Sequence, residues 1–287
     1  MRIFDKDNIR SVFAVHPFSE ENILERLRRT RATLDGLTAA DLAADEATEL
    51  TDQNHVGGMR FVRELAEAVG LRRQHRVLDL GCGLGGSARI MAALYQCQVH
   101  GIDLSDKRCR EADSLTNLVG LSHLVSFECD DFLTMEVPAG LYDILWGQGA
   151  WLQVPDKRDF VQRWSGCLAE GGRIAFEHAC LARPAKEAPE EKPALEKALA
   201  ELESSWQAQL ISPQDWLDLF AAAGLTVVHL EDHTQIFVDY YTRLAELAQS
   251  TLAGRVPSAE SEGWRRARDC AESGIISYLR LVAEKSA

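Results

Sequence analysis

Short apolar runs alternate with amphipathic stretches along most of the chain. Residues 77–80, 97–102, 123–129, 142–146 and 173–180 have the length and apolar content of buried strands. Between them, apolar residues recur at helical spacing and predict helices over 87–95, 105–119 and 156–169. This alternation of strands and helices predicts an α/β domain with a mainly parallel sheet.

The second half of the chain adds two further predicted strands, at 225–230 and 275–283. The fold we predict is a Rossmann-like, doubly wound sheet of seven strands, mostly parallel, with the last strand antiparallel. Residues 51–287 would form this domain, and 233–273 would be a helical insertion before the last strand.

Other segments predict a helical cap. Residues 1–50 have helical patterns over 20–34, where Ser19 can cap the first turn, and over 39–47. A charged, proline-containing stretch at 183–193 precedes an amphipathic helix at 194–206, which suggests a lid inserted at 182–210. Further helices are expected over 59–70 and from Pro213 to Gly224.

The composition of the chain limits the classes of partner that it can be expected to bind. The 287 residues carry a formal net charge of −13, which disfavours nucleic acids and anionic membrane surfaces. The chain has neither a secretory pattern at its amino terminus nor an apolar run of about 18 residues. Its seven cysteines form no CxxC pair, a usage that favours a reducing cytoplasm and argues against a metal site.

The most informative stretch is RVLDLGCGLGG, residues 76–86. It predicts a strand, a glycine-rich turn and the start of a helix, an arrangement that binds nucleotides or nucleosides. Gly81, Gly83 and Gly86 also satisfy the dinucleotide pattern GxGxxG, so the glycines alone leave the ligand open. Asp79 would repel a pyrophosphate and suits a cationic ligand.

With Asp79 included, the sequence Asp79-Leu80-Gly81-Cys82-Gly83-Leu84-Gly85 resembles the first motif, (D/E)xGxGxG, of the class I S-adenosylmethionine (SAM) methyltransferases. SAM carries a sulfonium and an ammonium group, which an acidic strand end suits. The resemblance implies SAM as the cofactor.

Five further residues, at the ends of the second, third and fourth strands, complete the expected cofactor site. Asp103, at the end of the second strand, is placed to accept ribose hydroxyls, although it could instead cap the next helix, a role that suits Ser105 better. The resemblance implies that Leu104 contributes beside it, that Asp131 takes the adenine amine and that Phe132 backs the ring. Alternatively, Asp130 and Asp131 simply end a strand. Gln148 leaves the fourth strand at the same edge of the sheet.

The segment at residues 52–58, DQxHxGG, is similar to methyltransferases of the glycine-betaine type, which methylate sarcosine and dimethylglycine. That similarity implies that Gln53 and His55 face the ligand cavity. The alternative is that Asp52 caps the following helix and His55 is exposed. Relatives often have a histidine where this chain has Gln153.

His55 and His178 are the candidate catalytic residues. His178 and Glu177 point to opposite faces of the predicted fifth strand, so at most one faces the cavity, and a structural role for His178 is equally open. Five aromatic residues are candidates for a substrate wall, of which we expect about two to line it: Trp146, Trp151, Phe237, Tyr240 and Tyr241.

The prediction is a SAM-dependent methyltransferase that acts on a small soluble molecule by in-line displacement, mainly through positioning. An amine nitrogen is the leading acceptor, and O- or C-methylation of a natural-product scaffold is the alternative. Two other classes remain open: a nicotinamide-dependent oxidoreductase and a non-catalytic SAM-binding protein. The oligomeric state is open, with a homodimer among the options.

Overall fold

The computed structural model describes residues 6, 7, 9, 18–44, 51–137, 139–182, 193–250, 253, 254 and 256–286. The predicted charged stretch 183–192 and most of the first 17 residues lie outside this description, as do residues 45–50.

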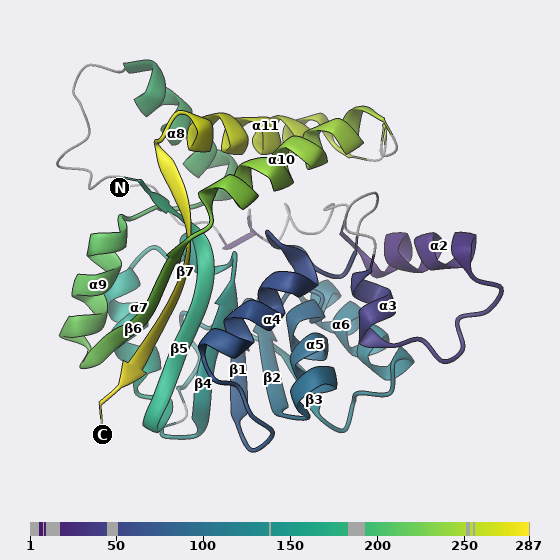
Figure 1. Cartoon of the computed structure of the whole chain (residues 1–287), viewed down its shortest axis with the longest axis horizontal. Coiled ribbons are helices and arrows are strands. Elements are labelled where there is room, and N and C mark those ends of the chain that lie inside the picture. Colours follow the sequence, from purple (N-terminus) through teal and green to yellow (C-terminus); the bar gives the residue numbers. More distant parts are fainter. Residues whose placement is uncertain are drawn as a thin grey trace.

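Seven strands form one sheet in the order β3-β2-β1-β4-β5-β7-β6. The strands are β1 (Arg76–Leu80), β2 (Gln98–Asp103), β3 (Val125–Cys129), β4 (Tyr142–Gln148), β5 (Leu168–Leu181), β6 (Leu225–Asp232) and β7 (Ile276–Lys285). The first five are mutually parallel, and β7 lies antiparallel between β5 and β6 (Figure 1). The predicted fold class is therefore confirmed.

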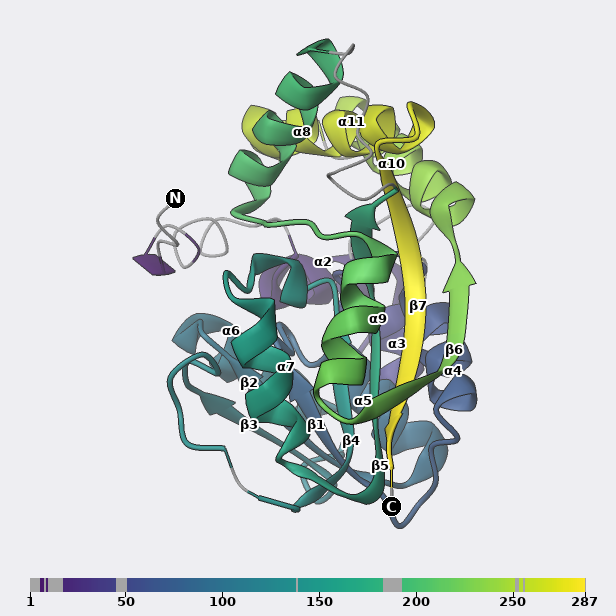
Figure 2. The same ribbon diagram turned by 90° about the vertical axis from the view of Figure 1, so that its left-hand side faces the viewer.

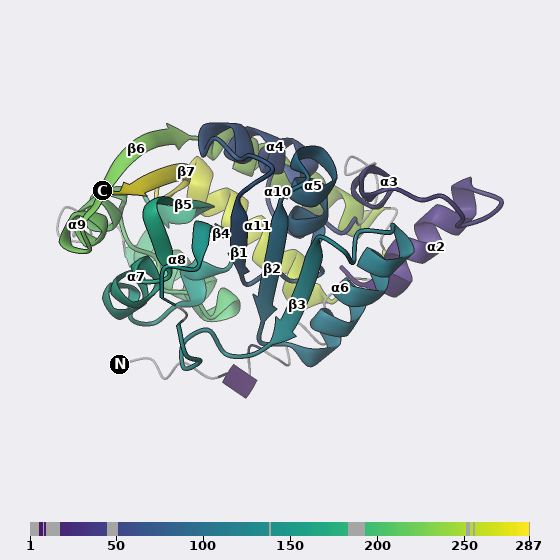
Figure 3. The same cartoon turned by 90° about the horizontal axis from the view of Figure 1, so that it is seen from below.

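Neighbouring residues of the central strands enter two separate cores, one on each face of the sheet. Val77 and Ile144 pack with α4 (Gly58–Ala68) and α5 (Gly86–Tyr95), whereas Leu78 and Leu145 pack with α7 (Lys157–Ser165) and α9 (Pro213–Ala222). Figures 2 and 3 show these helix pairs on opposite faces. Burial on both faces explains why these strands are continuous apolar runs in the sequence.

The helix α6 (Asp106–Leu118) contacts β2 and β3, and its amino terminus is capped by Ser105. The two amino-terminal helices lie beside it and α5. The first, α2 (Glu20–Thr30), is capped by Ser19 but ends four residues before the predicted end, because Arg31 is already extended. The second is the short α3 (Ala39–Ala43), which has a capping box from Thr38.

Three helices form a cap beyond the carboxyl ends of the central strands (Figures 1 and 2). They are α8 (Pro193–Trp206), α10 (Thr234–Gln249) and α11 (Ser258–Glu272), and α11 packs against both others. The 3₁₀ turn Trp151–Gln153 follows β4 at the same edge. None of the helices in the described ranges has the length and apolar character needed to cross a membrane.

The main difference from the predicted boundaries is in β5. It begins at Leu168, so that Gly171 and Gly172 lie within the strand and not before it. A register irregularity opposite, between Tyr142 and Ile144 of β4, accommodates this longer strand.

Candidate active site

The glycine loop between β1 and α5 is shaped by close contacts. Gly81 has φ +85°, and a Cβ there would lie 2.3 Å from the Cβ of Ala150. Gly85 has φ +73° and is the cap residue that precedes α5, and a Cβ there would lie 2.3 Å from the ring of Phe127. The loop therefore needs glycine at both positions, which leaves its backbone open to a ligand.

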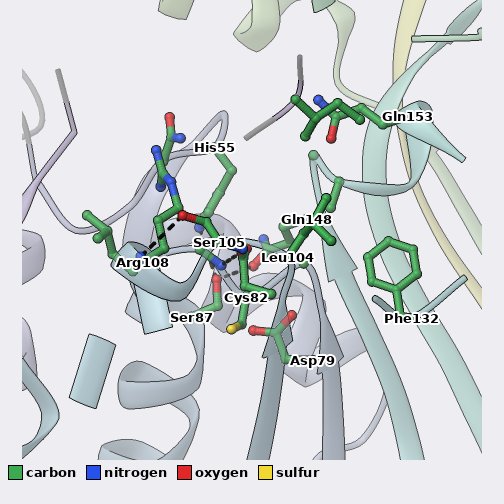
Figure 4. A pocket seen from close by; sticks show the side chains of 18 of the residues that line it. His55, Asp79, Cys82, Ser87, Leu104, Ser105, Arg108, Phe132, Gln148 and Gln153 are labelled. Carbon is green, nitrogen blue, oxygen red and sulfur yellow. Dashed lines mark hydrogen bonds between the residues drawn. The ribbon is translucent and has the colours of Figure 1, made fainter. Parts of the chain in front are cut away.

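A cavity of about 140 Å³ lies over this loop, at the carboxyl ends of the parallel strands (Figure 4). Eight of the nine predicted cofactor residues line it: Asp79, Gly81, Gly83, Asp103, Leu104, Asp131, Phe132 and Gln148. Gly85 lies behind them, where it shapes the loop. The predicted residues thus converge on one cavity, and their individual roles remain predictions.

Two carboxyl groups line the cavity, that of the buried Asp79 and that of the half-buried Asp103. Burial, and then repulsion from Asp103, raise the pKa of Asp79 to about 8. Burial also raises the pKa of Asp103, against the opposing effects of Arg108 and of the backbone N–H groups of Ser105 and Gly83. Among the described residues, no hydrogen bond reaches the Asp79 carboxyl group. A cationic ligand would relieve this excess of negative charge, so the residues fit the sulfonium and ammonium groups of SAM.

Asp103 also fixes the glycine loop. Its Oδ2 accepts a hydrogen bond from the Gly83 N–H at 2.9 Å, and its Oδ1 accepts one from the Ser105 N–H at 2.9 Å. Since Ser105 itself caps α6, capping is not the function of Asp103.

Asp131 and Phe132 follow β3. Asp131 accepts a hydrogen bond from the Leu133 N–H at 3.0 Å and forms an ion pair with Lys6. Burial works to raise the pKa of Asp131, but Lys6 and the hydrogen bonds lower it overall. Asp130 accepts the N–H of Asp131 at 2.6 Å, as expected of a turn residue.

The segment 52–58 is packed against the start of α5. Asp52 does not cap α4, because Gly57 occupies the cap position with φ +75°, and Asp52 instead forms a fully buried ion pair with Arg89 at 2.9 Å. The backbone oxygen of Asp52 would lie 2.3 Å from a Cβ at Gly86. The close approach of the Asp52 backbone to Gly86 keeps the segment next to the glycine loop and places His55 in the site.

Gln53 is buried behind His55 and lines neither of the cavities that His55 lines, so the expectation that it faces the ligand is corrected. Its amide nitrogen donates to Asp52 Oδ1 at 2.7 Å, and its oxygen lies 3.1 Å from His55 Nε2. Gln53 therefore positions the histidine. Burial lowers the pKa of His55 to about 4, so that the ring is neutral at physiological pH.

A chain of buried hydrogen bonds continues from His55 into the sheet. Ser87 Oγ lies 3.1 Å from His55 Nε2 and donates to Gln148 Oε1 at 2.7 Å. The Gln148 amide nitrogen donates to Glu177 at 2.8 Å, and Arg280 pairs with the same carboxylate at 2.5 Å. Burial raises the pKa of Glu177 to about 7, with Arg280 opposing the shift. The sequence pattern did not indicate Ser87, whose position in the first turn of α5 was its only signal.

A second cavity, of about 160 Å³, lies beneath the cap helices. His55, Asn54, Gly149 and Gln153 line both cavities, so the two are contiguous. Tyr240 lines the second cavity as predicted, together with Phe237 and Tyr241. The chain thus places Gln153 at the junction of the two cavities.

Three predicted residues lie elsewhere. Trp146 is completely buried in the α4–α5 core, and its Nε1 donates to Gln148. Trp151 lies in the other core, where its Nε1 donates to the carbonyl oxygen of Leu80 at 3.1 Å. Neither tryptophan lines either cavity, so both substrate assignments are corrected.

His178 also lies away from both cavities. It points to the α9 face of β5, where its ring lies 4.7 Å from the Phe176 ring and 5.1 Å from the Trp216 ring. Neither ring nitrogen has a hydrogen-bond partner within the part of the chain that the structure describes. Burial lowers its pKa to about 3. The alternation of β5 directs Glu177 to the site and His178 to the core, so His178 is a structural residue.

Comparisons with known proteins support this geometry. Residues 77–172 match a family model described as a methyltransferase domain. The chain is 28% identical over 259 residues to a rice (Oryza sativa subsp. japonica) protein named "Probable tocopherol O-methyltransferase, chloroplastic", covering 84% of this chain and 70% of that protein. It is 26% identical over 196 residues to the sarcosine/dimethylglycine N-methyltransferase of Halorhodospira halochloris, covering 67% of each.

Among solved structures, the geranyl diphosphate C-methyltransferase of Streptomyces coelicolor A3(2), in complex with S-adenosyl-L-homocysteine, has the same fold. Its TM-score is 0.71 at 16% identity, with 98% of this chain and 97% of that chain covered. The two curated relatives are named as O- and N-methyltransferases and the solved structure as a C-methyltransferase, so the names agree on methyl transfer and differ in the atom that is methylated.

Proposed function

The chain is a SAM-dependent methyltransferase of small molecules, and we propose that the atom it methylates is an amine nitrogen. SAM, when bound, supplies an activated methyl group next to the acceptor. The observation that carries the proposal is the position of His55, which lines both cavities at their junction and whose pKa burial lowers to about 4. The chain is also 26% identical over 196 residues to a sarcosine/dimethylglycine N-methyltransferase.

An amine nitrogen attacks only when it is unprotonated, and most aliphatic amines are ammonium ions at neutral pH. His55 is the residue at the junction that can accept the proton. Its Nδ1 lies 3.1 Å from the Val56 carbonyl oxygen, and its Nε2 lies 3.1 Å from Gln53 Oε1. Since both of these oxygens accept hydrogen bonds, a ring that carries two protons satisfies both contacts, whereas burial favours its return to the neutral form.

The remaining residues act by binding and orientation. We expect Asp79 to face the cationic end of SAM, Asp103 and Leu104 to hold the ribose, and Asp131 with Phe132 to hold the adenine. Gln148 is held by Ser87 and Glu177 and closes the cavity at the β4 edge. Positioning of this kind can contribute about 7–11 kcal/mol to a displacement reaction.

The test combines His55→Ala with a pH series. With methyl-labelled SAM and a secondary amine, kcat/KM should fall about 10²–10⁴-fold at pH 7. The deficit should shrink as the pH rises towards the pKa of the amine, because the substrate then arrives already unprotonated. Gln153→Ala is the matched control, since it lines the same cavities without a titrating group. An equal deficit at every pH, or a labelled product methylated only on oxygen or carbon, would contradict the proposal.

We also infer a cytoplasmic site of action, which the seven free cysteines support. Recovery of the native protein with cystine bridges would contradict it. The expected lack of a nucleic-acid partner and the homodimer stay predictions.

A further inference from the structure

The second cavity has mainly aromatic walls. Six aromatic residues from α8, α10, α11 and β7 line it: Trp206, Phe237, Tyr240, Tyr241, Trp264 and Tyr278. The rings of Trp206 and Tyr241 lie 6.0 Å apart, and that of Phe237 lies 4.6 Å from Tyr241 and 6.5 Å from Trp206. These three rings form one continuous surface, against which another ring can stack.

The lining carries a single acidic side chain. Apart from His55, Glu260 is the one charged side chain among the described lining residues. It accepts a hydrogen bond from Trp264 Nε1 at 3.1 Å and interacts electrostatically with Arg108, which lines the first cavity. A carboxylate or a phosphate on the acceptor would therefore meet aromatic rings and an anion. A neutral or cationic acceptor would meet complementary surroundings, since aromatic faces attract ammonium groups.

The size and one polar group of the cavity add to this picture. Its volume of about 160 Å³ is close to that of an engineered apolar cavity, about 150 Å³, that binds benzene. The Tyr278 side chain lines the cavity, and its hydroxyl is buried without a hydrogen-bond partner among the described residues. A polar atom of a ligand would supply the partner that this hydroxyl lacks.

We propose that the acceptor is a ring-bearing, mainly apolar molecule without a carboxylate or phosphate group. Its ring packs against the surface formed by Trp206, Phe237 and Tyr241, and its reacting atom reaches the His55 junction. This inference rests on methyl transfer at this site, but it does not depend on whether nitrogen or oxygen receives the methyl group. It separates this chain from enzymes of amino acids such as sarcosine.

Binding can be measured without turnover. The protein is loaded with S-adenosylhomocysteine, and tryptophan fluorescence is recorded, since Trp206 and Trp264 lie in the wall. Four ligands are titrated: tetrahydroisoquinoline, its phenolic counterpart tetrahydronaphthol, sarcosine and phosphoethanolamine. We expect the two bicyclic compounds to bind at least tenfold more tightly than the two small amines that carry a carboxylate or a phosphate group. Comparable or tighter binding of sarcosine or phosphoethanolamine would overturn the proposal.

Variants locate the binding. Trp206→Ala should weaken binding of the bicyclic ligands at least fivefold, and Trp206→Phe should restore most of it, while the affinity for S-adenosylhomocysteine stays unchanged. Tyr278→Phe should weaken the binding of tetrahydronaphthol without lowering the thermal midpoint, because the hydroxyl makes no hydrogen bond to the described residues. Ring binding unaffected by Trp206→Ala would refute the assignment. If the bicyclic ligands bind but only the phenol is methylated, this inference stands and the amine proposal fails.

Discussion

Cofactor binding should release a proton from Asp79. This carboxyl group is 2% exposed, and burial together with repulsion from Asp103 raises its pKa to about 8. A cationic ligand stabilises the ionised form, so the carboxyl group should ionise as SAM binds. Replacing it with Asn removes the titration and keeps the shape of the side chain.

The size of the effect follows from the shift. With a pKa of about 8, roughly nine in ten Asp79 side chains are protonated at pH 7, so binding should release ~0.9 proton. Ionisation at pH 7 then costs ~1.4 kcal/mol, so the Asp79 contribution alone should make SAM binding about tenfold weaker at pH 7 than at pH 9, relative to the Asp79→Asn variant. The same shift affects folding: the raised pKa gives stability below pH 3.8 that is lost as the pH rises through about 8, on the order of 5 kcal/mol in total.

Isothermal titration calorimetry in buffers with different ionisation enthalpies counts the protons. The α-amino group of the ligand titrates in the same range, near 7.7–8.0, and takes up protons, so the difference between wild type and Asp79→Asn is the informative quantity. S-adenosylhomocysteine, which lacks the sulfonium charge, should show a smaller release. Identical proton counts in wild type and variant, together with parallel affinity profiles from pH 6 to 9, would refute the reasoning.

Three further predictions concern single positions. Gly81→Ala should abolish cofactor binding in calorimetry, since its Cβ would lie 2.3 Å from the side chain of Ala150. The control is Gly120→Ala, at φ +71° with no atom within 4 Å of the added Cβ. It should lower the free energy of unfolding by only about 1–2 kcal/mol and keep the affinity for the cofactor. Asp52→Asn should lower the free energy of unfolding in urea by about 3–5 kcal/mol, because it leaves the buried Arg89 without its ion-pair partner. The double variant Asp52→Leu/Arg89→Met should recover most of this stability. A loss below about 1 kcal/mol in the single variant would be contrary evidence. The neutral His178 stabilises the fold above its unfolded pKa of 6.5, and this stability is lost as the pH falls towards its folded pKa of about 3. His178→Leu should therefore flatten the decline of the urea midpoint between pH 7 and 4. An unchanged slope would count against this reasoning.

The sheet and the cofactor cavity were predictable because local patterns determine them. The strand at 76–80 is buried on both faces and so appears as an apolar run, and the loop after it requires glycine at fixed positions. Asp79, Asp103 and Asp131 each lie at or near the carboxyl end of a strand, and parallel strands bring these ends to one edge of the sheet.

The acceptor side was less predictable because it depends on packing between distant segments. Strand alternation indicates that Glu177 and His178 point in opposite directions, but only the assembled sheet shows which face carries the site. Trp146 and Trp151 resemble wall residues in sequence and are core residues in the structure. Gln53 was predicted near the ligand from its motif, and the turn geometry at Gly57 places it one layer behind.

The two contiguous cavities share Asn54, His55, Gly149 and Gln153 but differ in the rest of their lining. Every predicted contact to the donor lies within residues 77–172, the span that matches the family model, whereas six of the aromatic residues in the second cavity come from residues 206–278. Substitutions that reshape the acceptor cavity can therefore accumulate during evolution without disturbing the cofactor site. Divergence in such a lineage should concentrate in the later half, and a chimera that exchanges that half should inherit the acceptor preference of its new parent.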